Sequence, residues 1–422
     1  MVTLPGSKSI TNRALAAAAL ADGHSLLVGA SPAHDTRLMI DVLGELGVAV
    51  TADEEAHNIE ITGCGGQLPA GEADLLCGGA GTTLRFAAGL CATAYGRYRL
   101  DGAPRLQQRP VGPLVDALRA FGALVEYHGQ EGFPPFTVHA RHLSGGHLSL
   151  DASQSSQFVS ALLLAAPYAA RDVMIELPPP VVSAPYIKMT LAIMDRFGVS
   201  VIDQFDGGEA RFIVPAQQRY AGCHYAIEPD ASSAGYFLAA AAVTGGRVTV
   251  PGLGSSSIQG DVGFVDVLEQ MGCTAQRDPD VVTIQGPPPS RLSAVDIDLS
   301  DMPDMVPTLA VLALFADGRT TIRNVAHLRL KESDRLEALG RELARLGAAV
   351  EAREDGLAID PPETIRPATV HTYDDHRMAM SFALCGLAVD GVRIENPLCC
   401  EKSLPDFFDR WDEMLEKKKG SG

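Results

Sequence analysis

The sequence lacks the cysteine patterns that build metal centres and redox pairs. Its eight cysteines are scattered along 422 residues, and no two of them are spaced as C-x-x-C. This excludes a zinc ribbon and a thioredoxin-like motif, and no other cluster has metal-ligand spacing. Cys399 and Cys400 are adjacent, which is too cramped for an ordinary disulfide. Scattered thiols and no readable signal peptide predict a reducing compartment, namely the cytoplasm.

Long apolar runs and an excess of positive charge are missing as well. The longest apolar runs, such as residues 306–316, are well short of a membrane span. Lysine and arginine number 34 against 52 aspartates and glutamates, which gives a net charge of −18. This balance disfavours binding to nucleic acid or to an anionic membrane, so we expect neither as a partner.

A repeat of roughly 75 residues runs through the chain. Amphipathic segments that end in an apolar residue and a glycine recur at this interval, and each glycine precedes a short β-like run. These glycines are Gly47, Gly122, Gly198, Gly272 and Gly347. A glycine that caps a helix and leads into a strand explains the arrangement. A sixth copy would end near residues 407–415, without the glycine.

A second helix, apolar on nearly every face, is expected in each repeat. The six stretches cover residues 14–20, 84–90, 158–166, 234–243, 306–315 and 378–387. Such a helix is buried, so each unit reads strand, buried helix, strand, loop, amphipathic helix, strand. Six units could form a closed ring, an open solenoid or two lobes of three. Because single cores rarely exceed about 250–300 residues, we favour two lobes with a hinge near Glu228-Pro229.

Cations stand at the starts of several buried helices. The free N–H groups and the dipole at a helix start favour anions and oppose cations. Lys8, Arg13, Arg85 and Arg377 nevertheless lie in first turns, which indicates that anions bind beside them. Further cations lie in three loops and are Arg105, Arg109, Lys331, Arg335 and Lys402. For residues 331–335, an ordinary salt-bridged helix surface stays an alternative.

Six short motifs occur in one order along nearly the whole chain. They are PGSKSITNR at 5–13, GTTLR at 81–85, RP at 109–110, SSQF at 155–158, KESDR at 331–335 and DHRMA at 375–379. These motifs resemble the signatures of the enolpyruvylshikimate-phosphate synthase family of enolpyruvyl transferases, the target of glyphosate. The resemblance implies an α/β (α+β) protein with an inverse α/β barrel-like fold. Each of its two domains would hold three βαββαβ-type repeats with buried helices.

The resemblance also implies a reaction. Family members move the carboxyvinyl group of phosphoenolpyruvate to the 5-hydroxyl of shikimate 3-phosphate and release phosphate, in the shikimate pathway. Residues 6–228 would form the lobe on the shikimate-phosphate side. Residues 229–422 with 1–5 would form the lobe on the phosphoenolpyruvate side, with the active site in the cleft between them. We expect a monomer that needs no metal or organic cofactor and binds these two anionic small molecules.

The family signatures carry roles onto matching positions of this chain. The expected catalytic residues are Asp304, Glu332 and Lys8. The residues expected to bind shikimate 3-phosphate are Lys8, Ser9, Arg13, Ser155, Ser156, Gln157, Ser183, Tyr186, Asp304, His327 and Lys331. Those expected to bind phosphoenolpyruvate are Lys8, Gly81, Thr82, Arg85, Arg109, Gln157, Arg335, His376, Arg377 and Lys402. Three positions depart from the family pattern: Gly79 and His327 stand in place of asparagine, and Phe86 in place of proline.

Two alternative functions are less favoured. A related enolpyruvyl transferase acts on a nucleotide sugar and normally carries a reactive cysteine where this chain has the loop 105–113. That loop has no cysteine, and Ser9 stands where the relative prefers asparagine. A non-catalytic anion-binding scaffold is the second alternative. It would have no use for Asp304 and Glu332, since binding anions gives no reason to place acids in the site.

Overall fold

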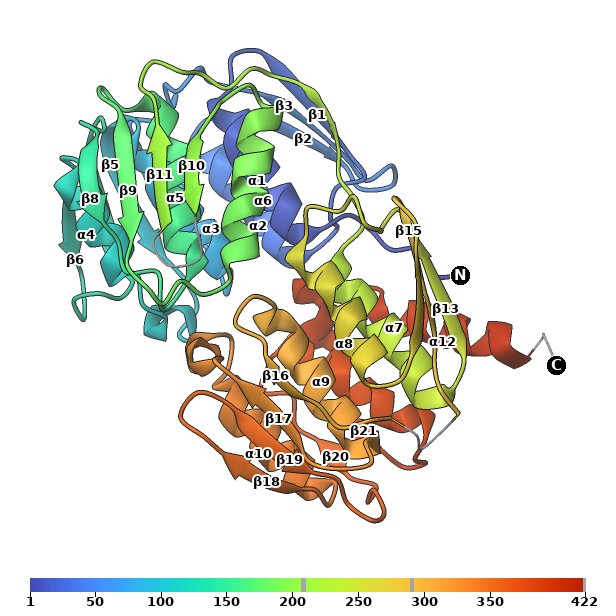
Figure 1. Ribbon diagram of the computed structural model, residues 1–422. Helices are drawn as coiled ribbons and strands as arrows, with labels where there is room; N and C mark the ends of the chain where they lie inside the picture. Colours follow the sequence, from blue (N-terminus) through green and yellow to red (C-terminus); the bar gives the residue numbers. More distant parts are fainter. Residues whose placement is uncertain (206–209, 289–291, 420–422) are drawn as a thin grey trace. The chain divides into compact units, whose positions relative to one another are not determined.

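The computed structural model describes residues 1–205, 210–288 and 292–419, which form two compact units (Figure 1). The first lobe is Gly6–Ile227, and the second lobe is Met1–Pro5 with Glu228–Gly422. Along the sequence, the boundary between the two units falls between Ile227 and Glu228, one residue before the predicted boundary. Residues 420–422 of the predicted second lobe lie outside the described residues. None of the described helices combines the length and hydrophobicity that a membrane span needs.

Buried and amphipathic helices alternate in the first lobe. The buried helices are α1 (Lys8–Leu20), α3 (Gly81–Ala92) and α5 (Ser156–Ala165). The amphipathic helices are α2 (His34–Glu45), α4 (Gly112–Ala120) and α6 (Ala184–Arg196). Every residue of α1 from Ile10 to Leu20 is buried, which confirms the prediction drawn from its all-round apolar sequence.

The described strands of the first lobe form sheets of one pattern. Their orders are β4-β5-β7-β6, β10-β11-β9-β8 and β12-β1-β3-β2. Each sheet has one parallel pair, and its other pairs are antiparallel. The strands are β1 (His24–Val28), β2 (Ala49–Asp53), β3 (Asn58–Thr62), β4 (Glu72–Leu76), β5 (Tyr95–Asp101), β6 (Leu124–Tyr127), β7 (Phe136–Arg141), β8 (Gly146–Ser149), β9 (Val173–Leu177), β10 (Ile202–Phe205), β11 (Ala210–Val214) and β12 (His224–Ala226). Because β12 returns to pair with β1, the end of the lobe completes its first repeat.

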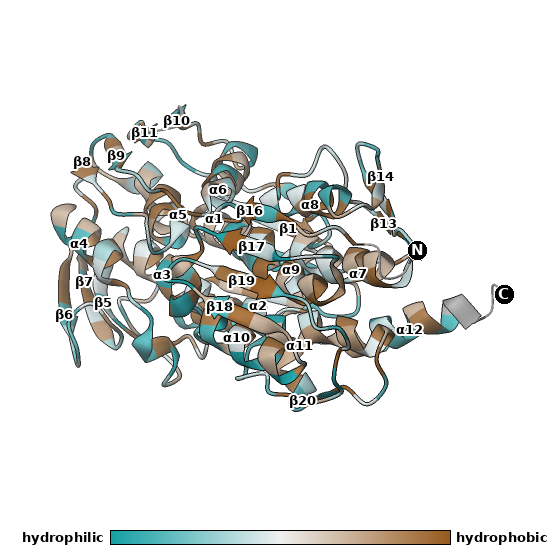
Figure 2. Ribbon diagram, turned by 60° about the horizontal axis from the view of Figure 1, so that its bottom comes forward, coloured by the Kyte–Doolittle hydropathy of each residue, from teal (hydrophilic) through white to brown (hydrophobic). Residues whose placement is uncertain are grey.

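The second lobe repeats the alternation of buried and amphipathic helices, but only one of its described sheets has four strands. Its buried helices are α7 (Ala231–Thr244), α9 (Val306–Leu312) and α11 (His376–Phe382), and its amphipathic helices are α8 (Phe264–Gln270), α10 (Arg335–Arg345) and α12 (Phe407–Lys419). The described strands are β13 (Arg247–Pro251), β14 (Thr274–Arg277), β15 (Val281–Gln285), β16 (Asp296–Asp298), β17 (Thr320–Arg323), β18 (Ala349–Ala352), β19 (Leu357–Asp360), β20 (Thr369–Val370) and β21 (Arg393–Ile394). They are ordered β13-β15-β14, β16-β17-β19-β18 and β20-β21. Figure 2 shows that the central strand β19 is mostly hydrophobic, in keeping with the burial of Leu357, Ala358 and Ile359.

Three segments of the second lobe differ from the expected repeat. Helices α9 and α11 continue as the 3₁₀ turns η5 (Ala313–Phe315) and η7 (Ala383–Leu387), so both α-helices are shorter than their apolar stretches predict. The N-terminal segment joins this lobe, because Val2 N–H donates to the carbonyl oxygen of Thr249 in β13 at 2.9 Å. Val2 and Leu4 are buried in the core of this lobe.

The predicted glycine caps are confirmed at all five positions. Gly47, Gly122, Gly198, Gly272 and Gly347 have φ angles of 82°, 98°, 86°, 100° and 105°. A residue with a Cβ atom is strained in this left-handed region, so glycine ends each amphipathic helix and turns the chain into the next strand.

The close packing of α3 against α5 gives a test of the fold. A Cβ atom at Gly89 in α3 would lie 2.6 Å from the backbone oxygen of Ala161 in α5. We expect Gly89→Ala to lower the free energy of unfolding by about 1–3 kcal/mol, because helix backbone cannot yield as a flexible side chain can. Urea unfolding followed by circular dichroism measures this loss.

The matched control is Gly44→Ala in α2, where an added Cβ would meet nothing within 4 Å. Removal of glycine from that helix should raise stability by up to about 1 kcal/mol. Equal unfolding midpoints for the two variants would show that α3 and α5 do not approach each other this closely.

Candidate active site

Helix α1 of the first lobe begins with a lysine held by the neighbouring helix. Ser7 caps α1 by accepting a hydrogen bond from Ile10 N–H, so the helix starts at Lys8. Lys8 Nζ lies 3.2 Å from Asp35 Oδ2 of α2, and 14% of the Lys8 side chain stays exposed. The carbonyl oxygen of Asp35 accepts a hydrogen bond from Thr83 of α3. The ammonium group is thus positioned beside the starts of two buried helices.

Arg13 is buried among polar and aromatic partners. Its guanidinium donates to Thr190 Oγ1 at 2.8 Å and to the Ser9 carbonyl oxygen at 2.9 Å. The rings of Phe86 and Tyr186 lie 5.3 and 5.8 Å from its central carbon. Burial lowers the pKa of Arg13 to about 10, so it remains a cation at neutral pH. Phe86, a departure from the family pattern, therefore supplies an aromatic face for this cation.

A hydrogen-bonded chain joins the first turns of α3 and α5. Arg85 Nη1 donates to Gln157 Oε1 at 2.6 Å, and Gln157 Nε2 donates to Thr82 Oγ1 at 3.0 Å. Arg85 Nη2 donates to the carbonyl oxygen of Pro110 at 3.0 Å. Three residues that the sequence placed in one binding site thus contact one another directly.

The guanidinium of Arg109 lies over the start of α3. A Cβ atom at Gly81 would be 2.8 Å from both Arg109 Cζ and Arg109 Nη1. Only a residue without a side chain permits this approach. The positive charge of Arg109 is therefore placed at the end of the helix where free N–H groups already favour an anion.

The remaining predicted residues of the first lobe lie at the starts of α5 and α6. Ser155 caps α5 by accepting a hydrogen bond from Gln157 N–H at 3.2 Å, and Ser156 follows it. Ser183 has a left-handed backbone, with φ of 56°, directly before α6, and Tyr186 lies in the first turn of that helix. The sequence-predicted residues of this lobe thus gather at the N-terminal ends of α1, α3, α5 and α6.

In the second lobe, Arg335 is the centre of an ionic network. Its side chain is 1% exposed and donates from Nε to Asp375 Oδ2 at 2.8 Å and from Nη2 to Asp375 Oδ1 at 3.2 Å. Nη1 donates to Asp304 Oδ1 at 3.1 Å, and Nη2 donates to Glu332 Oε2 at 2.9 Å. Burial opposes the charge of Arg335, but these carboxylates outweigh it and raise its pKa.

Two more cations reach the same pair of predicted catalytic acids. Arg377 donates from Nη2 to Asp304 Oδ2 at 2.5 Å and from Nη1 to the Tyr236 hydroxyl at 3.1 Å. Lys402 Nζ lies 3.9 Å from Glu332 Oε1. Asp304 and Glu332 keep side-chain exposures of 20% and 16%, so both carboxylates face a ligand-accessible surface as well as the buried arginine.

The two predicted histidines lie beside this network. His327 is buried, and its Nε2 has no hydrogen-bond partner among the described residues. Burial and the nearby charge of Lys331 lower the pKa of His327 to about 3, so the imidazole is neutral. His376 is buried at the start of α11, with Nδ1 3.6 Å from Asp375 Oδ1.

Sequence reasoning missed several side chains that hold these residues in place. Asp375 caps α11 and binds Arg335 with both oxygens, and Asp35 pairs with Lys8. Asp375 directly precedes His376 and Arg377 in a motif already singled out, which was the available signal. Asp261 also escaped notice: it accepts a hydrogen bond from Ser232, and burial together with the charge of Asp304 raises the pKa of Asp261 to about 7.

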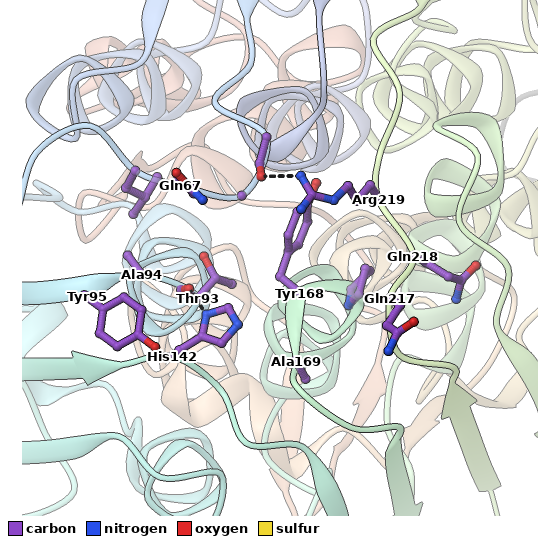
Figure 3. Close-up of a pocket in the computed structure, with 14 residues that line it drawn as sticks. Gln67, Thr93, Ala94, Tyr95, His142, Tyr168, Ala169, Gln217, Gln218 and Arg219 are labelled. Carbon is purple, nitrogen blue, oxygen red and sulfur yellow. Dashed lines mark hydrogen bonds between the residues drawn. The ribbon is translucent and has the colours of Figure 1, made fainter.

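A cavity of about 520 Å³ in the first lobe contains none of the predicted residues (Figure 3). It lies where α1 and α3 end, and its wall includes Thr93, His142, Tyr168 and Arg219. Figure 3 shows Arg219 pointing to the loop at Gly65, whose oxygen it binds at 3.2 Å. The predicted residues instead gather at the opposite ends of these helices.

Comparisons with known proteins identify the family to which the chain belongs. The family model of EPSP synthase (3-phosphoshikimate 1-carboxyvinyltransferase) matches residues 1–411. A 3-phosphoshikimate 1-carboxyvinyltransferase of Nostoc punctiforme is 48% identical over 99% of this chain and 96% of its own length. The chloroplastic enzyme of that name from Solanum lycopersicum is 46% identical over 99% of this chain and 82% of its own length.

A solved structure agrees with the fold. The EPSP synthase from Acinetobacter baumannii superposes with a TM-score of 0.78, covers 97% of this chain and 94% of its own, and is 24% identical. This likeness extends over both lobes and bears out the predicted fold class. The motifs, the family model and the curated relatives together show that the chain belongs to the EPSP synthase family.

Proposed function

We propose that this protein is a 3-phosphoshikimate 1-carboxyvinyltransferase. It moves the carboxyvinyl group of phosphoenolpyruvate to the 5-hydroxyl of shikimate 3-phosphate, releases phosphate, and serves the shikimate pathway. The observation that carries the proposal is the pair of partly exposed acids, Asp304 and Glu332, held by the buried Arg335. A site that only bound anions would gain nothing from two carboxylates there.

Two carboxylates suit the proton transfers of this reaction. The substrate hydroxyl must lose a proton as it attacks the central carbon of phosphoenolpyruvate, and the methylene carbon must gain one. We assign the first transfer to Asp304 and the second to Glu332. The tetrahedral intermediate then returns the methyl proton and expels phosphate. Ion pairs with Arg335 and Arg377 hold the Asp304 carboxylate in place for this transfer.

Phosphoenolpyruvate presents a phosphate and a carboxylate, and both need cations. We assign them to arginines and lysines, whose guanidinium groups can bind either anion with two hydrogen bonds. The set is Lys8, Arg85, Arg109, Arg335, Arg377 and Lys402, with Gly81, Thr82, Gln157 and His376 beside them. Lys8 also stabilises the leaving phosphate or donates a proton to it.

Shikimate 3-phosphate combines a phosphate with ring hydroxyls. We assign its recognition to Lys8, Ser9, Arg13, Ser155, Ser156, Gln157, Ser183 and Tyr186 of the first lobe, and to Asp304, His327 and Lys331 of the second. The gathering of the first-lobe members at four helix starts supports this, since such ends bind phosphate well. We assign both clusters to one active site in which the two lobes contact the same substrate pair.

The composition of the chain and the proposed reaction together suggest a cellular setting. We propose a monomeric cytoplasmic enzyme whose partners are small anions and that binds neither nucleic acid nor membrane. The net charge of −18 supports the second point, and eight cysteines without a disulfide support a reducing compartment. Addition and elimination at phosphoenolpyruvate call for no metal or organic cofactor.

A coupled phosphate-release assay tests the function directly. Purified protein should release phosphate only when both phosphoenolpyruvate and shikimate 3-phosphate are present. Release with a nucleotide sugar in place of shikimate 3-phosphate, or release from phosphoenolpyruvate alone, would refute the assignment.

Substitution of Asp304 tests the proposed base. Asp304→Asn keeps the side-chain shape but cannot accept the hydroxyl proton, so we expect kcat to fall by about 10²–10⁴-fold. Binding of shikimate 3-phosphate, measured by calorimetry, should be largely retained. The matched control is Asp296→Asn, which removes an exposed carboxylate paired with Arg323 and should keep full activity. Near-normal turnover by Asp304→Asn would assign the base elsewhere.

Substitution of Gly81 tests the phosphoenolpyruvate cluster. The new Cβ atom of Gly81→Ala would lie 2.8 Å from the Arg109 guanidinium and displace it. Loss of one charge-assisted contact should raise the KM for phosphoenolpyruvate about tenfold or more. The KM for shikimate 3-phosphate should stay unchanged. A rise confined to the KM for shikimate 3-phosphate would mean that Arg109 serves the other substrate.

A further inference from the structure

A buried tyrosine of the second lobe contacts one of the arginines assigned to phosphoenolpyruvate. Tyr236 lies in α7 with its side chain fully buried, and its hydroxyl oxygen accepts a hydrogen bond from Arg377 Nη1 at 3.1 Å. Arg377 lies in the first turn of α11, and 7% of its side chain is exposed, so a ligand can reach it. The contact therefore joins the interior of the lobe to a cation of the candidate active site.

Aromatic packing holds the ring of Tyr236 in place. The ring of Phe407, at the start of α12, lies 5.8 Å from it at an interplanar angle of 79°. Phe407 also packs against Phe237 and Trp411, with ring centroids 5.6 and 5.3 Å away. Edge-to-face contact is a preferred geometry of aromatic pairs. The Tyr236 hydroxyl therefore has a fixed position, and it can serve as an anchor for Arg377.

Helix α7 also packs closely against the turn that carries Asp304. This turn is η4 (Pro303–Met305), and a Cβ atom at Gly235 would lie 2.7 Å from Met305 Sδ. The absence of a side chain at Gly235 thus permits the close approach. Tyr236 follows directly in the sequence, so the helix that positions its hydroxyl is held next to the turn of the proposed base.

The guanidinium of Arg377 is shared between a charged and a neutral partner. Nη2 donates to Asp304 Oδ2 at 2.5 Å, while Nη1 donates to the Tyr236 hydroxyl. The other oxygen of Asp304, Oδ1, accepts a hydrogen bond from Arg335 Nη1 at 3.1 Å. Burial raises the pKa of Tyr236, so the phenol is neutral at neutral pH. A neutral oxygen fixes Nη1 without cancelling the positive charge of the guanidinium.

Without this hydroxyl, a different pairing of Arg377 and Asp304 becomes favourable. Arginine and a carboxylate often form a two-pronged pair, in which two N–H groups donate to the two oxygens. Such a pair would draw Nη1 of Arg377 toward Asp304 and place two arginines on the same two oxygens. Arg377 would then offer fewer N–H groups to an anionic ligand.

We propose that Tyr236 is a positioning residue for Arg377, which it keeps in a single-contact pair with Asp304 so that the guanidinium can also bind phosphoenolpyruvate. The identity of this anion rests on the proposed function. Because Tyr236 is fully buried, it acts through the arginine and not on the substrate. Phe407 supports it from α12.

Tyr236→Phe tests the anchor, since it removes the hydroxyl oxygen and keeps the ring. The KM for phosphoenolpyruvate should rise about tenfold or more, because a buried and charged N–H group loses its acceptor. The KM for shikimate 3-phosphate should stay unchanged, and kcat should fall by less than the KM for phosphoenolpyruvate rises. An unchanged KM for phosphoenolpyruvate in the folded variant would overturn the proposal.

The matched control is Tyr220→Phe in the first lobe. Tyr220 is fully buried as well, its hydroxyl donates to the Leu164 carbonyl oxygen at 3.0 Å, and its ring packs edge-to-face against Phe197. Its variant should lose a similar part of the stability against urea and leave both KM values unchanged. An equal rise in the KM for phosphoenolpyruvate in both variants would reduce the role of Tyr236 to general stability.

Arg377→Lys tests whether the effect passes through the arginine. This change should itself raise the KM for phosphoenolpyruvate, and Tyr236→Phe should add nothing in that background. Effects that multiply would show that Tyr236 acts independently of Arg377. Phe407→Leu is a second variant that keeps the hydroxyl and loosens the ring. It should raise the KM for phosphoenolpyruvate by a smaller factor, and no rise would count against the anchor even if Tyr236→Phe fails to fold.

A crystal structure of Tyr236→Phe makes the test independent of the transferase reaction. Nη1 of Arg377 should lie within hydrogen-bond distance of an Asp304 oxygen. A guanidinium that keeps its place would overturn the positioning role, whatever the kinetics. Inactivity of the unaltered protein with both substrates would refute the proposed function alone, because the position of Arg377 decides whether Tyr236 holds it.

Discussion

The buried guanidinium of Arg335 is the interaction on which the second lobe's site depends. A charge so deeply buried is stable only with opposite charges around it, and three carboxylates supply them, from Asp375, Asp304 and Glu332. Of these, Asp375 is fully buried and anchors the arginine. The other two remain partly exposed. One cation thereby fixes the geometry of both proposed proton-transfer groups, and a change in its position would move both together.

The charge balance of this network suits the proposed chemistry. Arg335, Arg377 and Lys402 face three carboxylates, so the described ion pairs nearly cancel. When Asp304 takes a proton from the substrate hydroxyl, the balance shifts by one positive charge. That shift coincides with the growth of negative charge on the reacting substrates. The first lobe differs at Arg13, whose described hydrogen-bond partners are neutral oxygens.

Much of this arrangement was predictable from the sequence, because it depends on local patterns. All-round apolar stretches identify the buried helices, and five glycines in phase identify the helix ends. Cations in the first turns of buried helices pointed to anion binding. The return of β12 to β1 could not be predicted from local patterns, because it joins segments far apart in the chain. The pairing of Val2 with β13 is equally distant in sequence, and only the family resemblance placed residues 1–5 in the second lobe. The ion pair between Asp375 and Arg335 could not be predicted either. An acidic residue just before a helix is equally well explained as a helix cap.

The departures from the family pattern show why residue types alone do not settle a site. Phe86 packs its ring against Arg13, a contact that no local pattern reveals. His327 is neutral because of burial, so it can take the place of a neutral amide where a charged imidazole could not. Both substitutions are accommodated through neighbours supplied by other elements of the same lobe.

The central claim is that the cation clusters of both lobes act on one pair of substrates. A crystal structure of the enzyme with shikimate 3-phosphate and an unreactive phosphoenolpyruvate analogue tests it most directly. The account predicts that a single analogue molecule contacts Arg109 or Lys8 and, at the same time, Arg335 or Lys402. An analogue held by residues of one lobe only, with the other cluster facing bulk water, would contradict it.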